Sequence, residues 1–399
     1  MIKILFISFC LLAFSNAEKT IVAFKNKYCE HRSLNTIRRN NGIISVNHFE
    51  HLGIAVLDFE ESFNYENFLN NSIFADCIED YSENHSVFID LPISFEGKEK
   101  QWQLKRTNVS SLPLPLDFTR NISQPDDFKS HVIIIDTGID KEHPDLKSSI
   151  APENQHKSFV DFDVCCEYES DPLCDCGEHG SHCAGLVASP LAGYNTSTTL
   201  HSLKVFDYTG STTYEIILSA MDEAIELKNT YFPDELTIVS MSLGGPKTQA
   251  LNIAANRLVD AGLFLVVAAG NENQDAQNVS PASAENAFTV GASDINDNRA
   301  YFSNYGTKID IFAPGVDIYS CKPGGGYQFM SGTSMATPFV AGFVSAVASS
   351  KRLTDPKEIK KEIEKHLSIN KVVNSRSTNN NLPFDGESSL IKEEVSLIQ

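Results

Sequence analysis

The sequence predicts an α/β protein: a doubly wound parallel sheet with a buried central helix, preceded by a small α+β domain. Two observations support this prediction. Between residues 130 and 300, apolar runs that suit buried strands alternate with segments of helical spacing. Residues 331–350 begin with small residues and continue as a run that is apolar or small on every face. A helix of that composition is enclosed by protein on all sides.

Five apolar runs predict the strands of the sheet, at residues 132–136, 199–206, 237–243, 263–270 and 287–294. Three segments have helical spacing, at residues 213–229, 249–262 and 355–367. The carboxyl ends of parallel strands meet at one edge of a sheet. We therefore expect the functional side chains to gather along that edge.

Ser334 lies where the buried helix is expected to begin. Pro338 falls in the first turn, where its missing N–H costs little. The first N–H groups of a helix are unpaired and carry the positive end of the macrodipole, so Ser334 is well placed beside a developing oxyanion. The alternative is that Ser334 only caps the helix, because serine is a favoured N-cap.

Three more polar residues follow or open apolar segments. Asp136 ends the first predicted strand, and Asn271 follows the fourth as a side-chain donor. His179 opens another small, apolar segment of helical type. An Asp, a His and a Ser in this chain order can form a hydrogen-bonded triad for nucleophilic catalysis. For Asn271 taken alone, a turn residue is the simpler interpretation.

Specific motifs surround these residues: DTGID at Asp136, HGSHCAG at His179, SLGG at 242–245, AAGNEN at Asn271, FSNYG at 302–306 and GTSMATP at Ser334. On these motifs the chain resembles the subtilisin-like serine proteases, most closely their proteinase K-like branch, from about residue 101 to residue 386. The resemblance implies that Asp136, His179 and Ser334 are the catalytic triad. Asn271 and the N–H of Ser334 would form the oxyanion hole, and His182 would be a second, non-catalytic histidine.

The resemblance also implies a cleft that binds an extended peptide as an added strand. The residues concerned are Gly210, Ser211 and Thr212, then Ser242, Leu243 and Gly244, and finally Ala268, Ala269 and Gly270 at the S1 pocket. The pocket group is small and uncharged, so we expect an endopeptidase with broad, apolar-leaning specificity. No acidic residue appears in these three stretches, which argues against a convertase specific for basic pairs.

The expected chemistry requires no cofactor, but the resemblance implies a structural calcium. Its ligands would be the carboxylate of Asp310 and the backbone carbonyls of Glu285 and Ala287, which are oxygen ligands of the kind calcium prefers. Glu285 departs from the family, which has a proline there. The alternative is that Asp310 merely caps a turn.

The N-terminal part of the chain predicts export. Residues 1–17 have one lysine, an apolar centre and a small-residue end, as a secretory signal peptide does. The following segment, with strands at 20–25 and 52–59 and a helix at 65–74, resembles the ferredoxin-like inhibitory propeptide of the family. The predicted division is signal peptide 1–17, propeptide 18–100, peptidase domain 101–386 and a tail without a readable signal, 387–399.

The composition of the chain indicates which classes of partner it can bind. The net charge of −20 argues against nucleic acid, and 42% hydrophobic residues indicate a folded chain with a large core. After the signal peptide, no apolar run reaches the length of a membrane span. The expected partners are protein and peptide substrates and the chain's own propeptide, with a monomer as the expected state.

The cysteines also suit a secreted protein. Cys29 and Cys77 can bridge within the propeptide. Cys165, Cys166, Cys174 and Cys176 crowd one loop, where two disulfides are favoured over a metal knuckle. Cys183 matches a cysteine that is usually free in the proteinase K-like branch, and Cys321 stays free or pairs with it. Glycosylation sequons stand at Asn70, Asn84, Asn108, Asn121, Asn195 and Asn278.

The sequence therefore predicts a secreted serine endopeptidase that is made as a zymogen and processes itself. A pseudoprotease retained for binding is the main rival from another class. That role would not require all four of Asp136, His179, Ser334 and Asn271, so their presence argues against it. Ser181, where the family usually has threonine, is a conservative departure.

Overall fold

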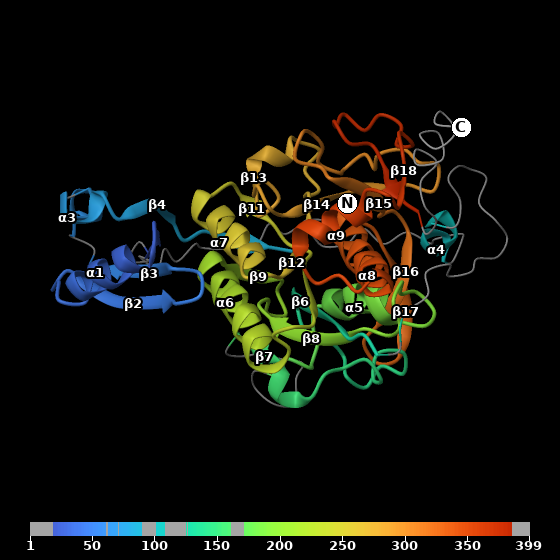
Figure 1. The fold of residues 1–399 in the computed structure, drawn as a ribbon, viewed down its shortest axis with the longest axis horizontal. Coiled ribbons are helices and arrows are strands. Elements are labelled where there is room, and N and C mark those ends of the chain that lie inside the picture. Colours follow the sequence, from blue (N-terminus) through green and yellow to red (C-terminus); the bar gives the residue numbers. More distant parts are fainter. Residues whose placement is uncertain are drawn as a thin grey trace, which may run out of the picture.

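The central feature of the fold is a parallel sheet (Figure 1). The computed structural model describes residues 19–60, 63–70, 72–89, 101–107, 125, 127–160 and 171–384. Within these residues, seven strands form the sheet in the order β15 (Ile311–Pro314), β14 (Phe288–Ser293), β12 (Phe264–Ala268), β10 (Leu236–Met241), β6 (Ser130–Asp136), β8 (Thr199–Lys204) and β7 (Lys157–Ser158). Every neighbouring pair runs parallel. The predicted α/β class is confirmed.

Both faces of the sheet are buried, because side chains along each strand alternate between two cores. In β6, Val132 and Ile134 belong to the core around the central helix, and Ile133 and Ile135 belong to the core on the other face. All four are at most 2% exposed. An apolar run on both faces is what the sequence of this strand predicted.

Helices cover the two faces of the sheet (Figure 1). One face carries α5 (His179–Ala188), α8 (Thr333–Lys351) and α9 (Pro356–Ile363), and the other carries α6 (Tyr214–Tyr231) and α7 (Gln249–Asp260). In α8 every side chain from Thr333 to Ser349 is buried, so this is the enclosed helix that the sequence predicted. Gly262, with φ +88°, follows α7 in the left-handed conformation expected of a terminating glycine.

The remaining elements are short. They are helix α4 (Trp102–Thr107), the 3₁₀ turns Glu153–Gln155 and Ala276–Asn278, and the strands β5 (Ser86–Phe88), β9 (Ser211–Thr213), β11 (Gly245–Pro246), β13 (Val279–Ser280), β16 (Ile318–Lys322), β17 (Gly326–Met330), β18 (Leu367–Ser368) and β19 (Leu382–Pro383). α4 is anchored by Trp102, which donates to the carbonyl of Val316 at 3.1 Å, and by a buried ion pair between Arg106 and Asp297. Trp102 and Leu104 of α4 thus belong to the same buried cluster as the central helix of the predicted peptidase segment.

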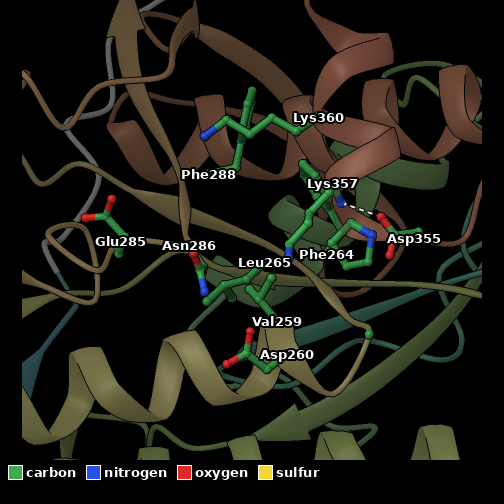
Figure 2. Close-up of a pocket in the computed structure, with 12 residues that line it drawn as sticks. Val259, Asp260, Phe264, Leu265, Glu285, Asn286, Phe288, Asp355, Lys357 and Lys360 are labelled. Carbon is green, nitrogen blue, oxygen red and sulfur yellow. Dashed lines mark hydrogen bonds between the residues drawn. The ribbon is translucent and has the colours of Figure 1, made fainter.

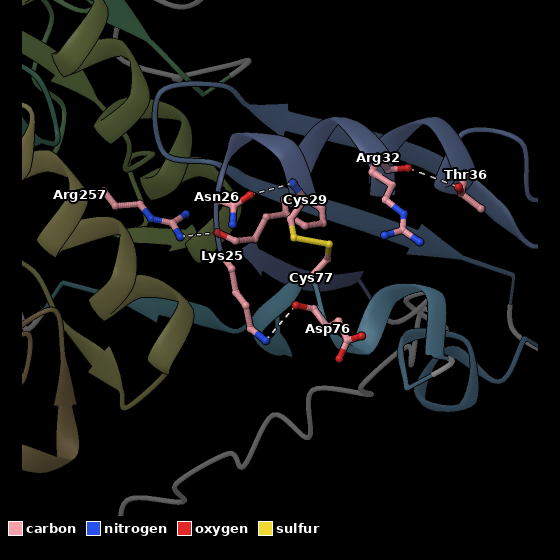
Figure 3. Close-up of a disulfide and its surroundings, with 9 residues drawn as sticks. Lys25, Asn26, Cys29, Arg32, Thr36, Asp76, Cys77 and Arg257 are labelled. Atoms are coloured by element: carbon pink, nitrogen blue, oxygen red, sulfur yellow. Dashed lines mark hydrogen bonds between the residues drawn. A yellow bond between two sulfur atoms is a disulfide. The ribbon is translucent and has the colours of Figure 1, made fainter.

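The N-terminal unit has its own sheet and core. Its elements are β1 (Lys19–Phe24), α1 (Lys27–Ile37), β2 (Ile43–Phe49), β3 (Ile54–Phe59), α2 (Tyr65–Leu69), α3 (Ser72–Ala75) and β4 (Ile78–Glu83). The strands form an antiparallel sheet in the order β2, β3, β1, β4. The disulfide expected between Cys29 and Cys77 is present and ties α1 to the start of β4 (Figure 3). This unit is an α+β domain, as the sequence predicted.

The N-terminal unit docks on the outer surface of α6 and α7. Arg257 of α7 donates to the carbonyl of Leu52, to the carbonyl of Gly53 at 3.0 Å, to the carbonyl of Phe24 at 2.5 Å and to the Glu79 carboxylate at 2.7 Å. On α6, the carboxylate of Asp222 accepts the N–H groups of His51 and Leu52 at 2.9 and 3.1 Å. Apolar packing accompanies these hydrogen bonds, because Leu52 and Ile54 of the N-terminal unit belong to the same buried cluster as side chains of α6 and α7.

The structure differs from the sequence prediction in several elements. Strands β2, β7 and β15 were not expected, and the helix expected at residues 65–74 is broken into α2 and α3. Asn195 is 2% exposed and donates through Nδ2 to Ser345 Oγ at 2.8 Å, so a glycan on this sequon is incompatible with the fold. A strand of two to four residues is too short to show a periodic pattern of apolar residues. The edge strands β7 and β15 could therefore not be predicted from the sequence.

Some predictions lie outside the described residues. They are the signal peptide at 1–17, the sequons at Asn108 and Asn121, the cysteines Cys165 and Cys166, and the tail at 387–399. Among the described residues, no helix is both long enough and apolar enough to cross a membrane.

A cluster of buried histidines lies at the amino-terminal edge of the sheet. The Nδ1 atom of His131 lies 2.9 Å from Nε2 of His201, and its Nε2 lies 2.5 Å from the Glu235 carboxylate. The ring of His131 also stacks on Phe232. His156 accepts the N–H of Ser202 through Nδ1 and donates through Nε2 to a backbone carbonyl, which is the pattern of a neutral imidazole.

Burial lowers the pKa of all three histidines. It takes the pKa of His201 to about 3, with further depression from neighbouring His131 and His156, and it lowers the pKa of His131 despite the Glu235 carboxylate. Desolvation is also the main cause of the lowered pKa of His156. The folded protein therefore holds these groups neutral at pH values where an unfolded chain would charge them.

This difference predicts acid sensitivity. A group whose pKa is lower in the folded state stabilises the fold above its unfolded pKa, and that stability is lost as pH falls from about 6.5 toward about 3. We expect Tm to fall between about pH 7 and about pH 4, and to fall less steeply in His201→Gln. The same change at the exposed His31 is the control and should keep the wild-type slope. An unchanged slope in His201→Gln would contradict the assignment.

Candidate active site

Asp136 and His179 meet at the carboxyl edge of the sheet. Asp136 is the last residue of β6 and His179 is the first residue of α5. The Nδ1 atom of His179 lies 2.8 Å from Oδ1 and 3.0 Å from Oδ2 of Asp136, and both residues are 1% exposed. Burial opposes a charged imidazole, but the Asp136 carboxylate and the neighbouring Cys183 together outweigh it and raise the pKa of His179 well above its usual value. The carboxylate therefore stabilises the imidazolium that forms when the ring takes up a proton.

Ser334 is the second residue of α8 and lies at the start of that buried helix. Its Oγ donates to the carbonyl of Ser242 at 3.4 Å, and its own carbonyl accepts from Ser242 Oγ at 2.8 Å. Within the described part of the chain, Nε2 of His179 has no hydrogen-bond partner. Catalytic hydrogen bonds are often long in ligand-free proteins and tighten with substrate, so this geometry agrees with a base that receives its proton later.

Asn271 is held beside Ser334 by hydrogen bonds to Thr333, the residue that precedes Ser334. Its Oδ1 accepts the N–H of Thr333 at 2.8 Å and the hydroxyl of Thr333 at 3.0 Å. These two bonds orient the amide with its oxygen toward α8, which leaves the nitrogen as the donating end. Asn271, Thr333 and Ser334 line the same pocket. The predicted turn role and the predicted donor role of Asn271 are compatible.

His182 and Cys183 occupy the layer behind His179. His182 Nε2 lies 3.1 Å from the carbonyl of Ile318 and 3.3 Å from that of Gln328, and burial lowers the pKa of His182 to about 3. His182 therefore stays neutral and braces the β16–β17 hairpin. Cys183 Sγ lies 3.8 Å from Nδ1 of His179, and burial raises the pKa of this thiol. Cys183 and Cys321 are both free, which decides between the two alternatives left by the sequence.

The predicted cleft residues are only partly brought together. Ser242, Leu243, Gly244, Ala268 and Gly270 line one pocket with Asn271 and Ser334. Ala269 is fully buried in a separate cluster and does not line that pocket. Gly210, Ser211 and Thr212 lie at a second wall and pair with another strand.

That strand is β5, which follows β4 of the N-terminal unit along the chain. It pairs antiparallel with β9, with Val87 opposite Thr212, and the N–H of Ile89 donates to the carbonyl of Gly210 at 2.9 Å. Ile89 also lines the pocket that contains Ser334. The chain segment Ser86–Ile89 therefore lies along the wall where the sequence predicted an extended peptide, and it leads toward Ser334.

The sequence analysis missed Glu272, an acidic residue of the same pocket. Its Oε2 accepts from Asn304 Nδ2 at 2.6 Å, and it is exposed at the pocket rim. The signal was available, since Glu272 immediately follows Asn271 within AAGNEN. It went unused because only the small residues before Asn271 were assigned to the pocket.

One of the residues predicted to bind calcium, Asp310, is paired with a lysine. Asp310 Oδ1 accepts from Lys360 Nζ at 2.7 Å, and Oδ2 accepts the N–H of Thr289 at 2.9 Å. Figure 2 shows Lys360 extended across Phe288 on one wall of a pocket, and its Nζ lies 5.6 Å from the ring centre. Lys360 thus supplies the positive charge that calcium would supply at Asp310. The calcium site at Asp310 and the carbonyls of Glu285 and Ala287 stays a prediction from the sequence.

The fold and this edge of the sheet define the class: an α/β protein with a buried Asp–His pair at the carboxyl edge of its parallel sheet and a serine at the start of a buried helix. Residues 129–384 match the model described as the Subtilase family, so the chain belongs to the subtilase family. The resemblance to the subtilisin-like serine proteases is confirmed.

Several known proteins are similar to this chain. The cuticle-degrading protease of Metarhizium anisopliae is 41% identical over 256 residues, covering 64% of this chain and 63% of that protein. The alkaline serine protease ver112 of Corniculantispora psalliotae is 42% identical over 214 residues, 54% of this chain and 53% of its own length. The chain thus spans less than two thirds of these curated relatives. The crystal structure of a cold adapted subtilisin-like serine proteinase matches with a TM-score of 0.63 and 31% identity, over 73% of this chain and 100% of that one.

The Lys360–Asp310 contact predicts that stability does not depend on calcium. We expect Tm in excess chelator to equal Tm in added calcium, because the ammonium already neutralises the carboxylate. Lys360→Met keeps most of the aliphatic stem and removes the charge, and its Tm should rise with calcium. Asp310→Asn lacks the carboxylate and is the control that should not respond. A wild-type Tm that falls on chelation would restore the calcium site.

Proposed function

We propose that the protein is a secreted serine endopeptidase made as a zymogen, with Asp136, His179 and Ser334 as the triad. The observation that carries this proposal is the convergence of a buried Asp–His pair, a serine at a helix start and an amide donor on one edge of the sheet. Membership of the subtilase family supports it.

In the proposed chemistry, His179 takes the proton of Ser334 as Oγ attacks the scissile carbonyl, and later gives it to the leaving amine. Asp136 holds the tautomer of the ring and stabilises the imidazolium. Asn271 and the N–H of Ser334 donate to the tetrahedral oxyanion, and donors placed for that charge are the largest single aid to such reactions. These roles use Nε2 of His179, Oγ of Ser334 and the amide of Asn271, whose oxygen is fixed by Thr333.

The zymogen state is supported by the position of β5. Because β5 pairs with β9 and Ile89 lines the pocket of Ser334, the N-terminal unit blocks the site as a bound substrate strand would. This geometry favours a first cut directly beyond Ile89, ahead of the boundary predicted at residue 100. Docking on α6 and α7 through Arg257 and Asp222 would hold the unit in place before and after the cut.

Broad, apolar-leaning specificity is supported by the pocket lining. Ile89, Leu243 and Ala268 supply apolar surface, and the glycines leave backbone groups accessible. Glu272 is the single acidic group among the residues lining this pocket in the described structure, and its carboxylate is bound to the buried Asn304. A convertase site specific for basic pairs would require more carboxylates than this. We further propose that the protein is exported, is a monomer and acts on proteins or peptides. Nucleic acid is not among its proposed partners.

The first test compares the secreted wild type with Ser334→Ala by mass and N-terminal sequence. We expect the wild type to begin between residues 90 and 101 and the variant to retain its N-terminal unit, because the variant lacks the nucleophile. Ser331→Ala, the same change three residues earlier, is the control and should mature normally. If Ser334→Ala is cut like the wild type, another protease matures the chain. If neither is cut and the wild type cleaves no peptide, a binding role replaces the proposed one.

The second test measures kcat/KM for peptides that differ only at P1. We expect Phe, Leu and Ala to be preferred over Arg, because most of the lining is uncharged. Glu272→Gln should lower kcat/KM for the Arg peptide and leave the Phe peptide within about two-fold, since Coulomb attraction at an exposed rim is weak. A clear preference of the wild type for Arg would overturn the apolar specificity.

A further inference from the structure

The loop that precedes His179 contains a buried carboxylate with no role in the chemistry described so far. Asp175 is 6% exposed and accepts two hydrogen bonds, from the hydroxyl of Thr137 at 2.7 Å and from the N–H of Ser181 at 2.7 Å. Burial raises the pKa of Asp175, although both hydrogen bonds favour the carboxylate. Burying a carboxylate costs free energy unless its hydrogen bonds compensate for the lost hydration. The partners of Asp175 therefore indicate what this residue stabilises.

The two partners of Asp175 belong to the two elements that carry the Asp–His pair. Thr137 directly follows Asp136, and its N–H donates to Oδ1 of Asp136 at 2.7 Å. Ser181 lies in the first turn of α5, two residues after His179. The hydroxyl of Thr137 also accepts the N–H of Gly180 at 2.8 Å. Asp175 therefore closes a network of hydrogen bonds that sets the distance between the end of β6 and the start of α5.

This network takes the place of an ordinary helix cap. The residue before α5, Glu178, has φ +58° and makes no side-chain capping bond. The N–H groups of Gly180 and Ser181 are instead satisfied by Thr137 and Asp175. His179 is the first residue of the helix that is capped in this way, so any movement of the cap moves the imidazole.

The loop backbone is held tightly against the end of β6. A Cβ on Gly138 would lie 2.3 Å from the carbonyl oxygen of Cys174, and one on Gly177 would lie 2.7 Å from the Thr137 side chain. The fully buried Lys204 donates to the carbonyl of Thr137 at 2.7 Å and to that of Cys174 at 3.0 Å. The residues on either side of Asp175, Cys174 and Cys176, are both disulfide-bonded. This agrees with the disulfides favoured from the sequence and excludes these two sulfurs as thiolate metal ligands.

We propose that Asp175 is a positioning residue for the His179–Asp136 pair, and that the disulfides at Cys174 and Cys176 hold its carboxylate in place. The proposal rests on the proposed function for its kinetic consequences, but its geometric part does not. Asp175 does not reach the substrate; it acts through Thr137 and the first turn of α5. Misplacement of catalytic groups by about 1 Å can cost on the order of 100-fold in rate, so a small shift is enough to matter.

The test compares Asp175→Asn with Asp171→Asn in the mature enzyme. Asp171 lies in the same loop, accepts the N–H of Leu173 at 2.8 Å and pairs with Lys141, so it is a control of equal charge change without contact with the Asp–His pair. Active sites are counted with a fluorophosphonate label before kcat and KM are measured. We expect Asp175→Asn to lower kcat per labelled site roughly 10- to 100-fold with KM within about two-fold, and Asp171→Asn to change neither.

The disulfides are tested by replacing Cys165, Cys166, Cys174 and Cys176 together with serine. This variant should lose kcat by a similar factor, and adding Asp175→Asn to it should cause little further loss, because both changes release the same carboxylate. If the losses of kcat from the cysteine replacements and from Asp175→Asn were fully additive, the disulfides would not act through Asp175. Wild-type kcat per labelled site in Asp175→Asn, with only Tm lowered, would reduce Asp175 to a structural cap and overturn the proposal.

A readout without turnover separates this inference from the proposed function. In Ser334→Ala, the pKa of His179 is followed by NMR with and without Asp175→Asn. We expect Asp175→Asn to lower this pKa and Asp171→Asn to leave it unchanged, because a loosened Asp136 stabilises the imidazolium less. If the wild type hydrolyses no peptide but the shift is observed, the proposed function fails and the positioning role stands. An unshifted pKa overturns the positioning role whether or not the enzyme is active.

Discussion

The structure of the site depends on one costly interaction, the buried contact between Asp136 and His179. Two ionisable groups that are each 1% exposed must have their hydrogen bonds satisfied by protein. Thr137 supplies one bond to Asp136 from the backbone, and Cys183 contacts His179 from one turn along α5. The same requirement explains why α8 is enclosed by protein. This helix shields the Asp136–His179 pair from water and carries Ser334 at its start. A polar site of this kind can exist only where a large apolar core surrounds it.

The large elements and the polar residues at their ends could be predicted from sequence because they have local signals. Strand β6 reads as a continuous apolar run, and α8 is small or apolar all round. Asp136, His179, Asn271 and Ser334 each stand at the end of such an element, so topology alone brings them together. The specific motifs then identified the family, which the match over residues 129–384 bears out.

The features that the sequence did not reveal depend on contacts between distant segments. Lys360 reaches Asp310 across 50 positions, and nothing in the neighbourhood of either residue signals the pair. The pairing of β5 with β9 joins segments more than 120 residues apart. Edge strand β7 is two residues long and has no periodicity to detect. Glu272 was a different kind of omission, because its motif was noticed but its direction toward the pocket follows only from the fold.

Arg257 has a consequence for the timing of activation under the proposed function. It contacts four acceptors of the N-terminal unit, three backbone carbonyls and Glu79, and none of them lies near the cleft. Cutting the chain beyond Ile89 breaks none of these contacts. The freed unit would remain on α6 and α7 as a bound product, so cleavage and the onset of activity are separate events with a lag between them. The length of that lag is set by how slowly the unit dissociates or is itself digested, which gives a secreted enzyme time to leave the cell before it begins to act.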